Sequence, residues 1–488
     1  MSGHVTGQLA FEPASVLLRH LRAGRVSSRE LLEMHLRRVS ELNPVVNAVV
    51  AVNEQRARQE SDEADARLAR NEPRGPLEGL PMTVKDSLRT AGLRTTIGSK
   101  ALSGYVPAVD CAPVARLRAA GAIIFGKTNM PAFGLDIQTY NPMFGATSNP
   151  WDLRRTSGGS SGGSAAAIAA GLSPLEVGGD MGGSIRIPAH YCGVYGHKPS
   201  YGLIPDPPTG DEPAGFESAA DINVRGPIAR HPDDLDLALD VLAGPHGGEE
   251  KAWRLSLPRP RRDSLSEYRL AVWLADPAFP SAPDMEKVLR NAITSLREAG
   301  ARVDDAHPEL SLPDVHRDFL TLLISGLGPA IPYQRPISRS PAGIPGDSTL
   351  ARIVRAARLD HAGWLRVNDR RQAYRQRWQA FFERYDALLC PVAPTAAPFH
   401  HNGNGTRTAL SRVDIADHRR PYLDQTVWAG LVGLAYLPST VAPAGFSDSG
   451  LPVGMQIVGP YLEDRTTIDV ARRLADILGG FSLPPQCA

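Results

Sequence analysis

Cysteine is scarce in this sequence of 488 residues. The four cysteines, at positions 111, 192, 390 and 487, are scattered without Cys-X-X-Cys spacing, so neither a zinc site nor a disulfide framework is predicted. No apolar run reaches about 18 residues, and the first residues lack a basic start followed by an apolar stretch. We therefore expect a soluble, cytoplasmic protein that neither spans nor binds a membrane.

The sequence also lacks a net charge of either sign, with 53 Lys and Arg residues against 52 Asp and Glu residues. Without a broad positive field, nucleic acid is not an expected partner. The hydrophobic fraction of 42% and the charged fraction of 22% are typical of folded globular chains. The length allows two domains or one large α/β unit.

Helix and strand signals alternate along the chain, which predicts an α/β fold. A capping box of Ser27 and Glu30 opens a predicted helix that ends at Pro44. A short apolar run ends at Lys85 and predicts a core strand with this lysine at its tip. Further predictions are a helix and strand over 109–126, a strand at 191–196, a surface loop over 205–220, a β–α–β unit over 268–306 and a helical region over 310–385.

Two segments rich in glycine and serine, 158–164 and 178–186, flank a predicted helix and strand. In the second segment, Gly182 and Gly183 permit a tight turn, so that the main-chain amides from Met181 to Ser184 could converge on one point. Converging donors suit a developing oxyanion, and the Ser184 hydroxyl would then attack the carbonyl carbon.

A serine nucleophile needs a base at neutral pH. His190 and His197 flank the motif, but their context favours structural roles. Lys85 is the better candidate, because burial disfavours an ammonium ion and leaves a neutral amine. Lysine is otherwise rare here, with only six in the chain. Ser160 could pass a proton from Ser184 to Lys85.

Residues 156–202 closely resemble the amidase signature, and the resemblance extends over segments 77–88, 121–134, 148–152, 226–244, 385–398 and 451–460. It implies one catalytic unit over 1–488, with a large mixed β-sheet covered by helices on both sides. Residues 75–245 would form the signature core, and the variable helical region 310–385 would shape the substrate entrance.

The resemblance also implies roles for individual residues. Lys85 would be the base, Ser160 the bridging serine in a cis peptide, and Ser184 the nucleophile. The remaining implied residues are Met181, Gly182, Gly183 and Ser184 as main-chain donors of the oxyanion hole, Ser161, Asp180 and Arg186 as supporting groups, and Gly134, Gln138 and Tyr140 as pocket lining. No metal or cofactor is implied.

Three positions depart from the family pattern. Met181 stands where many members have Thr or Ile, Gly179 where Ser or Thr is common, and His197 where Leu is usual. Only main-chain chemistry is required of residue 181, so these changes concern the walls of the site. They leave the choice of substrate open.

The predicted function is hydrolysis of small carboxylic amides, with anilides, esters and carbamates (urethanes) as further candidate substrates. The oligomeric state is left open, with a homodimer as one alternative. A second hypothesis is the glutaminase subunit of a tRNA-dependent amidotransferase. It is disfavoured because the Ser-Ser-Asn, Arg and Tyr-Gly segment of that branch is not found between residues 310 and 420. A catalytically dead binding protein is disfavoured because Lys85, Ser160 and Ser184 are all present.

Some of these residues have structural alternatives. For Asp180 and Arg186 a buried ion pair that holds the loop is favoured over a part in the reaction. For Cys192 a buried, inert thiol is favoured. The arginine-rich stretch 352–384, with Trp364 and Trp378, is interpreted as a solvated helical face rather than a nucleic-acid surface.

Overall fold

An eight-stranded mixed sheet forms the centre of the computed structural model, which describes residues 9–207, 220–327, 349–400 and 410–487. Its strand order is β12-β11-β13-β17-β16-β9-β10-β8. Strand β11 is parallel to β12 and β13, whereas the other neighbouring pairs are antiparallel. The strands are β8 (Leu175–Asp180), β9 (Tyr195–Lys198), β10 (Val224–Ala229), β11 (Arg269–Val272), β12 (Arg302–Asp305), β13 (Ala387–Pro391), β16 (Ser439–Phe446) and β17 (Pro452–Val458).

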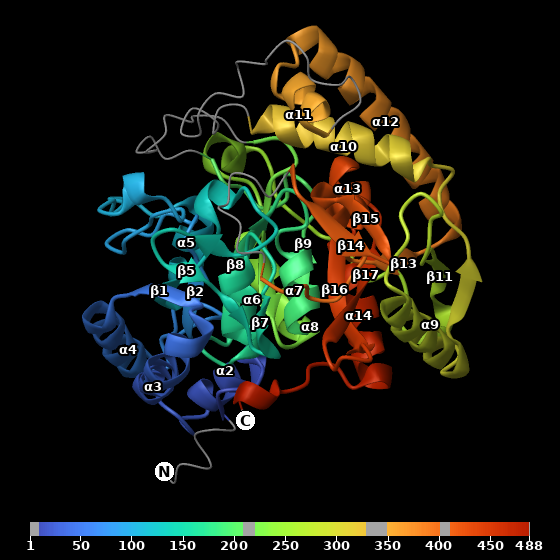
Figure 1. The fold of residues 1–488 in the computed structure, drawn as a ribbon. Coiled ribbons are helices and arrows are strands. Elements are labelled where there is room, and N and C mark those ends of the chain that lie inside the picture. The colour runs from blue at the N-terminus through green and yellow to red at the C-terminus, as the bar shows by residue number, and fades with distance from the viewer. Residues whose placement is uncertain (1–8, 208–219, 328–348, 401–409, 488) are drawn as a thin grey trace.

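Helices cover both faces of this sheet (Figure 1). One face packs on α8 (Pro232–Leu242), α9 (Pro283–Glu298) and α14 (Asp464–Leu478). The other packs on α6 (Gly162–Ala169), α7 (Arg186–Cys192) and α13 (Val427–Leu434). Because both faces are covered, central strands such as β13 and β17 are buried at every position instead of alternating. The predicted α/β/α fold is confirmed.

A smaller sheet, in the order β1-β3-β2, carries Lys85. Its strands are β1 (Val49–Val52), β2 (Pro81–Lys85) and β3 (Ile123–Thr128), with β2 parallel to β3. It lies against α3 (Ser28–Val46) and α4 (Glu54–Ala69), whereas α5 (Ala112–Ala119) packs against α8. Strand β2 also packs beside β8, and this contact brings the end of the small sheet to the end of the large one.

Further short elements are α2 (Ala14–Arg22), β4 (Tyr140–Asn141), β5 (Gly145–Ala146), β6 (Ser148–Asn149), β7 (Asp152–Thr156), β14 (Arg412–Ile415) and β15 (His418–Pro421). The capping box of Ser27 and Glu30 is present, as predicted. The predicted β–α–β unit over 268–306 is also confirmed, as β11, α9 and β12.

Two details of the sequence prediction are wrong. Helix α3 continues past Pro44 to Val46, because a proline in the last turn removes only one hydrogen bond. Its end is set instead by Asn47, which adopts a left-handed conformation. Cys192 ends helix α7 instead of lying in a strand, because Gly193 terminates that helix with a φ of 67°.

The predicted helical region contains α10 (Leu312–Gly326), α11 (Thr349–Ala357) and α12 (His361–Arg384), which lie together at the top of Figure 1 above α13. They enclose an aromatic cluster that includes Phe319, Trp378, Phe382 and Trp428. Residues 328–348 of this region, and residues 208–219 of the predicted loop, lie outside the described residues.

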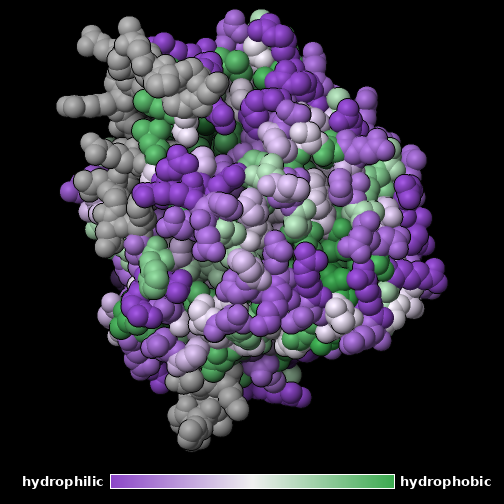
Figure 2. Space-filling model, turned by 45° about the vertical axis from the view of Figure 1, so that its right-hand side comes forward, coloured by the Kyte–Doolittle hydropathy of each residue, from purple (hydrophilic) through white to green (hydrophobic). Residues whose placement is uncertain are grey.

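Within the described residues, no helix is both long and apolar enough to cross a bilayer. The same residues contain no cluster of three or more His, Cys, Asp or Glu side chains arranged to hold a metal ion. Hydrophilic residues dominate the face shown in Figure 2, and hydrophobic side chains appear there in smaller groups among them.

Candidate active site

The amine of Lys85 contacts the first glycine- and serine-rich segment directly. Its Nζ lies 2.7 Å from Ser160 Oγ and 2.9 Å from Ser161 Oγ. Lys85 ends β2, the two serines immediately precede α6, and the Gly159–Ser160 peptide bond is cis. Only 2% of Lys85 is exposed, so the amine is shielded from water.

Ser184 lies between β8 and α7, in the second glycine-rich segment. Its carbonyl oxygen accepts a hydrogen bond from the main-chain amide of Ser161 at 3.0 Å. Ser160 and Ser184 are both buried, with 4% and 8% of each residue exposed. Lys85 thus contacts Ser160 directly. The Ser184 main chain is hydrogen-bonded to Ser161, the residue that follows Ser160.

The turn before Ser184 is tightly packed. Gly183 has a φ of +104°, and a methyl group there would lie 2.7 Å from Ala429 Cβ, so no larger residue fits. The amides of Gly183 and Ile185 donate to the Asp180 carboxylate at 2.8 and 3.1 Å. The Gly183 amide is therefore already engaged, which the sequence did not reveal.

Asp180 and Arg186 form a two-point ion pair beneath this turn. Arg186 donates from Nη2 and Nε at 2.8 and 2.9 Å, and its Nη1 reaches the Ala429 carbonyl and Gln456 Oε1, both at 2.8 Å. Burial alone would raise the pKa of Asp180, but the guanidinium outweighs it and holds that pKa well below its usual range. The pair ties the turn to α13 and β17.

Electrostatics at Lys85 favour a neutral amine. Burial, reinforced by the positive charge of Arg225, lowers the pKa of Lys85 from 10.5 to about 7. The negative charges of Asp180 and Glu176 oppose this shift. A substantial fraction of the amine is therefore unprotonated near neutral pH.

Two further lysines are buried, which sequence reasoning missed. Burial lowers the pKa of Lys127 to about 8 and that of Lys198 to about 7. Lys127 donates to the Leu88 carbonyl, and Lys198 donates to the carbonyls of Pro199 and Leu437 at 2.8 and 2.7 Å. The scarcity of lysine in the sequence could have signalled both, and Lys85 differs from them in contacting two serine hydroxyls.

Glu176, which precedes Asp180 on the same strand, was also missed. It is fully buried on β8, and its Oε1 accepts a hydrogen bond from Thr128 Oγ1 at 2.8 Å. Burial raises its pKa to about 7. An acidic residue within the apolar run of β8 was the available signal.

The structure separates the three predicted pocket residues. A methyl group at Gly134 would lie 3.4 Å from Ser160 Oγ, so Gly134 lies beside Ser160. The Gln138 amide instead donates to the Tyr422 hydroxyl at 3.1 Å. Tyr140 lies on β4 with 44% of its surface exposed.

The neighbouring histidines and Cys192 are held in buried contacts. His190 Nδ1 accepts from the Gly454 amide at 2.7 Å, and its Nε2 lies 3.0 Å from the Thr395 carbonyl. His197 contacts Thr440 and Asp464 at 2.9 and 3.1 Å. Burial raises the pKa of the Cys192 thiol. These contacts agree with the structural interpretation of all three residues.

Apolar side chains of α10 lie over the glycine-rich turn. A methyl group at Gly182 would meet Leu323 and Phe319 at 3.6 and 3.7 Å, and one at Gly326 would meet Met181 Cε at 3.2 Å. Met181, one of the three positions that depart from the family pattern, therefore packs against the helical region.

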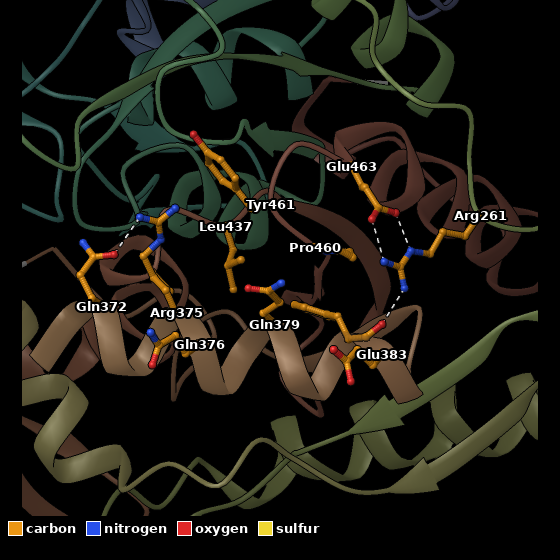
Figure 3. A pocket seen from close by; sticks show the side chains of 12 residues that line it. Arg261, Gln372, Arg375, Gln376, Gln379, Glu383, Leu437, Pro460, Tyr461 and Glu463 are labelled. Carbon is orange, nitrogen blue, oxygen red and sulfur yellow. Dashed lines mark hydrogen bonds and ion pairs between the residues drawn. The ribbon is translucent and has the colours of Figure 1, made fainter.

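A cavity of about 630 Å³ lies elsewhere, between α12 and the loop after β17 (Figure 3). Gln372 and Arg375 contact one another at one end, and Arg261 pairs with Glu463 at the other. Its lining includes none of the predicted catalytic residues. It is therefore separate from the serine and lysine cluster.

Comparisons with known proteins identify the family of this chain. A sequence model described as Amidase matches residues 30–468, and the chain belongs to this family. It is an enzyme that hydrolyses the C–N bonds of amides. A glutamyl-tRNA(Gln) amidotransferase subunit of Thermus thermophilus is 35% identical over 477 residues, which cover 92% of this chain and 93% of the relative.

Three solved structures are similar throughout. The 6-aminohexanoate cyclic dimer hydrolase complexed with substrate has a TM-score of 0.80 at 28% identity. The match covers 98% of this chain and 100% of the hydrolase chain. A bacterial aryl acylamidase of the amidase signature family has a TM-score of 0.80 at 25% identity, covering 96% of each chain. The corresponding glutamyl-tRNA(Gln) amidotransferase subunit from Thermotoga maritima has a TM-score of 0.73 at 25% identity, covering 94% of this chain and 95% of its own.

Proposed function

We propose that this enzyme hydrolyses small carboxylic amides through an acyl-enzyme on Ser184, with Ser160 and Lys85 as the proton relay. The observation that carries the proposal is the contact of the buried Lys85 amine with Ser160 Oγ at 2.7 Å, where burial lowers the amine pKa to about 7. A neutral amine in contact with a hydroxyl can accept its proton.

In the first half of the reaction, Ser184 Oγ attacks the substrate carbonyl carbon. The proton of Ser184 passes to Ser160, and the proton of Ser160 passes to Lys85 Nζ. The tetrahedral intermediate collapses as the C–N bond breaks, and the leaving amine takes a proton from Lys85 through Ser160. Water then attacks the acyl-enzyme, the relay runs again, and Ser184 is released.

Main-chain amides of the turn before Ser184 would stabilise the oxyanion. The Gly183 amide already donates to Asp180, so Met181, Gly182 and Ser184 are the donors that we propose for the substrate oxygen. Ser161, at 2.9 Å from Lys85 Nζ, would hold the amine in position. Asp180 and Arg186 would keep the turn in shape.

Two observations favour a small amide as substrate. The 6-aminohexanoate cyclic dimer hydrolase and the aryl acylamidase have higher TM-scores, at 0.80, than the Thermotoga maritima amidotransferase chain, at 0.73. In addition, Phe319 and Leu323 of α10 present apolar side chains to the turn at Gly182. We propose that the helical region 310–385 forms the wall of the substrate entrance.

A second candidate is the glutaminase subunit of a tRNA-dependent amidotransferase, which would work with partner subunits. The curated relatives favour it, since proteins named as this glutamyl-tRNA(Gln) amidotransferase subunit are 32% to 35% identical over more than nine tenths of this chain. The missing Ser-Ser-Asn, Arg and Tyr-Gly segment opposes it.

The purified protein should be tested on aliphatic amides, anilides, esters, carbamates and glutamine, with ammonia release measured for glutamine. We expect turnover of a small amide without added partners, loss of turnover and of labelling by a phosphonate probe in Ser184→Ala, and neither loss in Ser103→Ala, which changes an exposed serine. Turnover of glutamine alone would instead support the second candidate. Full activity of Ser184→Ala would contradict both.

A further inference from the structure

Gly179 and Arg225 are neighbours on adjacent strands near the end of β8. They are paired in the antiparallel register of β8 and β10. A methyl group at residue 179 would lie 2.6 Å from Arg225 Nη1, closer than non-bonded atoms approach. The guanidinium therefore occupies the space that a side chain at residue 179 would fill, and a larger residue there would displace it.

The Arg225 guanidinium contacts side chains from two other segments of the chain. Arg225 Nε donates to Asp206 Oδ2 at 2.5 Å, and Nη1 donates to Ser87 Oγ at 3.4 Å. Ser87 follows Lys85 by two residues. Most of the Arg225 side chain is buried, with 15% exposed. Its charge is thereby fixed beside the end of β2.

The main chain of Gly179 connects this guanidinium to the relay. Ser161 Oγ donates to the Gly179 carbonyl at 3.2 Å and accepts from the Gly179 amide at 3.3 Å. The same Oγ atom lies 2.9 Å from Lys85 Nζ. One glycine residue thus separates the arginine from the serine that contacts the base.

We propose that Gly179 and Arg225 form a positioning pair that holds a permanent positive charge beside Lys85 and so disfavours the ammonium form of this residue. The inference rests on the proposed function, because it concerns the same base. It also explains why residue 179 is glycine here, where Ser or Thr is common in the family. A side chain at residue 179 would displace the Arg225 guanidinium from this place.

Charged groups of both signs act on Lys85, and Arg225 supplies the positive charge among them. After burial, Arg225 is the largest influence that lowers the pKa of Lys85, whereas Asp180 and Glu176 raise it. An arginine stays charged at every pH of interest, so its effect is constant. Asp206 pairs with the guanidinium, and the thiol of nearby Cys111 is neutral because burial raises its pKa to about 12.

The test is the pH dependence of kcat/KM in Arg225→Gln, Arg225→Lys and Gly179→Ser. Removing a nearby like charge should raise the apparent pKa of the base by about one unit. Arg225→Gln should then lose about ten-fold in kcat/KM at pH values below both pKa values and approach the parent rate at high pH. Arg225→Lys should restore most of the parent profile.

Gly179→Ser should shift the profile in the same direction, because the added side chain displaces the guanidinium while leaving residue 225 unchanged. It also tests the inference if Arg225→Gln does not fold. Arg154→Gln is the matched control, since it removes another arginine paired with an aspartate, Asp152 at 2.9 Å. Its apparent pKa should equal that of the parent enzyme.

An equal loss of kcat/KM at every pH in Arg225→Gln and Gly179→Ser, with the apparent pKa unchanged, would overturn the inference and leave a purely structural pair. Failure of the proposed function looks different: the parent enzyme itself would show no ionisation near neutral pH, or Ser184→Ala would retain activity. The two outcomes are therefore distinguishable in one series.

Discussion

Replacing Asp180 by asparagine should destabilise the fold by roughly 3–5 kcal/mol, the usual cost of breaking a buried ion pair from one side. The change keeps the size of the side chain but removes its charge. Arg186, which is 0% exposed, would retain its positive charge with only neutral acceptors around it, among them the Ala429 carbonyl and the Gln456 side chain. The uncompensated charge, rather than lost packing, is the reason for the large effect.

The free energy of unfolding should be measured by urea titration of the parent and Asp180→Asn. The double variant Asp180→Asn, Arg186→Gln should recover part of the loss, because it removes the unpaired charge as well. Asp448→Asn is the control, since Asp448 pairs with Lys287 at 3.2 Å with both side chains largely exposed. Such surface pairs contribute little, so we expect no measurable change there.

The reasoning would be refuted if Asp180→Asn kept its free energy of unfolding within about 1 kcal/mol of the parent value while turnover disappeared. That result would give Asp180 a direct part in the reaction. A similar free energy of unfolding in the single and double variants would equally contradict the account, because the expected loss depends on the charge left on Arg186.

Three further predictions concern the relay. The parent kcat/KM should rise with pH with an apparent pKa of about 7, because Lys85 acts only when unprotonated. Lys85→Ala should lose most of the rate. A flat pH–rate profile of the parent would contradict a lysine base. Ser161→Ala should lower kcat up to about ten-fold with little change in KM, since Lys85 loses one of its two hydroxyl contacts; steady-state kinetics would test this, and an unchanged kcat would exclude a positioning role. Gly134→Ala should lower kcat without moving the pH midpoint, because the methyl group strains a φ of +71° beside Ser160 Oγ; an unaltered kcat would show that this glycine is dispensable.

Much of the local structure followed from the sequence. The capping box at Ser27 fixed the start of α3, because the Glu30 side chain and the Ser27 amide satisfy one another within a single turn. The apolar run before Lys85 predicted β2, and the resemblance to the amidase signature predicted the α/β/α fold. Such signals act over a few residues or are contained in a long motif. They failed where glycine or proline sat near a helix end, as at Pro44 and Cys192.

What only the tertiary structure decided are the contacts between distant segments. Strand β2 packs beside β8, and this places the Lys85 amine against Ser160, which is 75 residues away in the chain. The pKa of that amine depends on burial and on Arg225, which is contributed by yet another strand. The turn before Ser184 is likewise held by a distant segment, because Arg186 donates to the Ala429 carbonyl, 243 residues away in the chain. Proton affinity and hydrogen-bond occupancy are set by the surroundings of an atom, and a linear sequence does not specify those surroundings until the chain has packed.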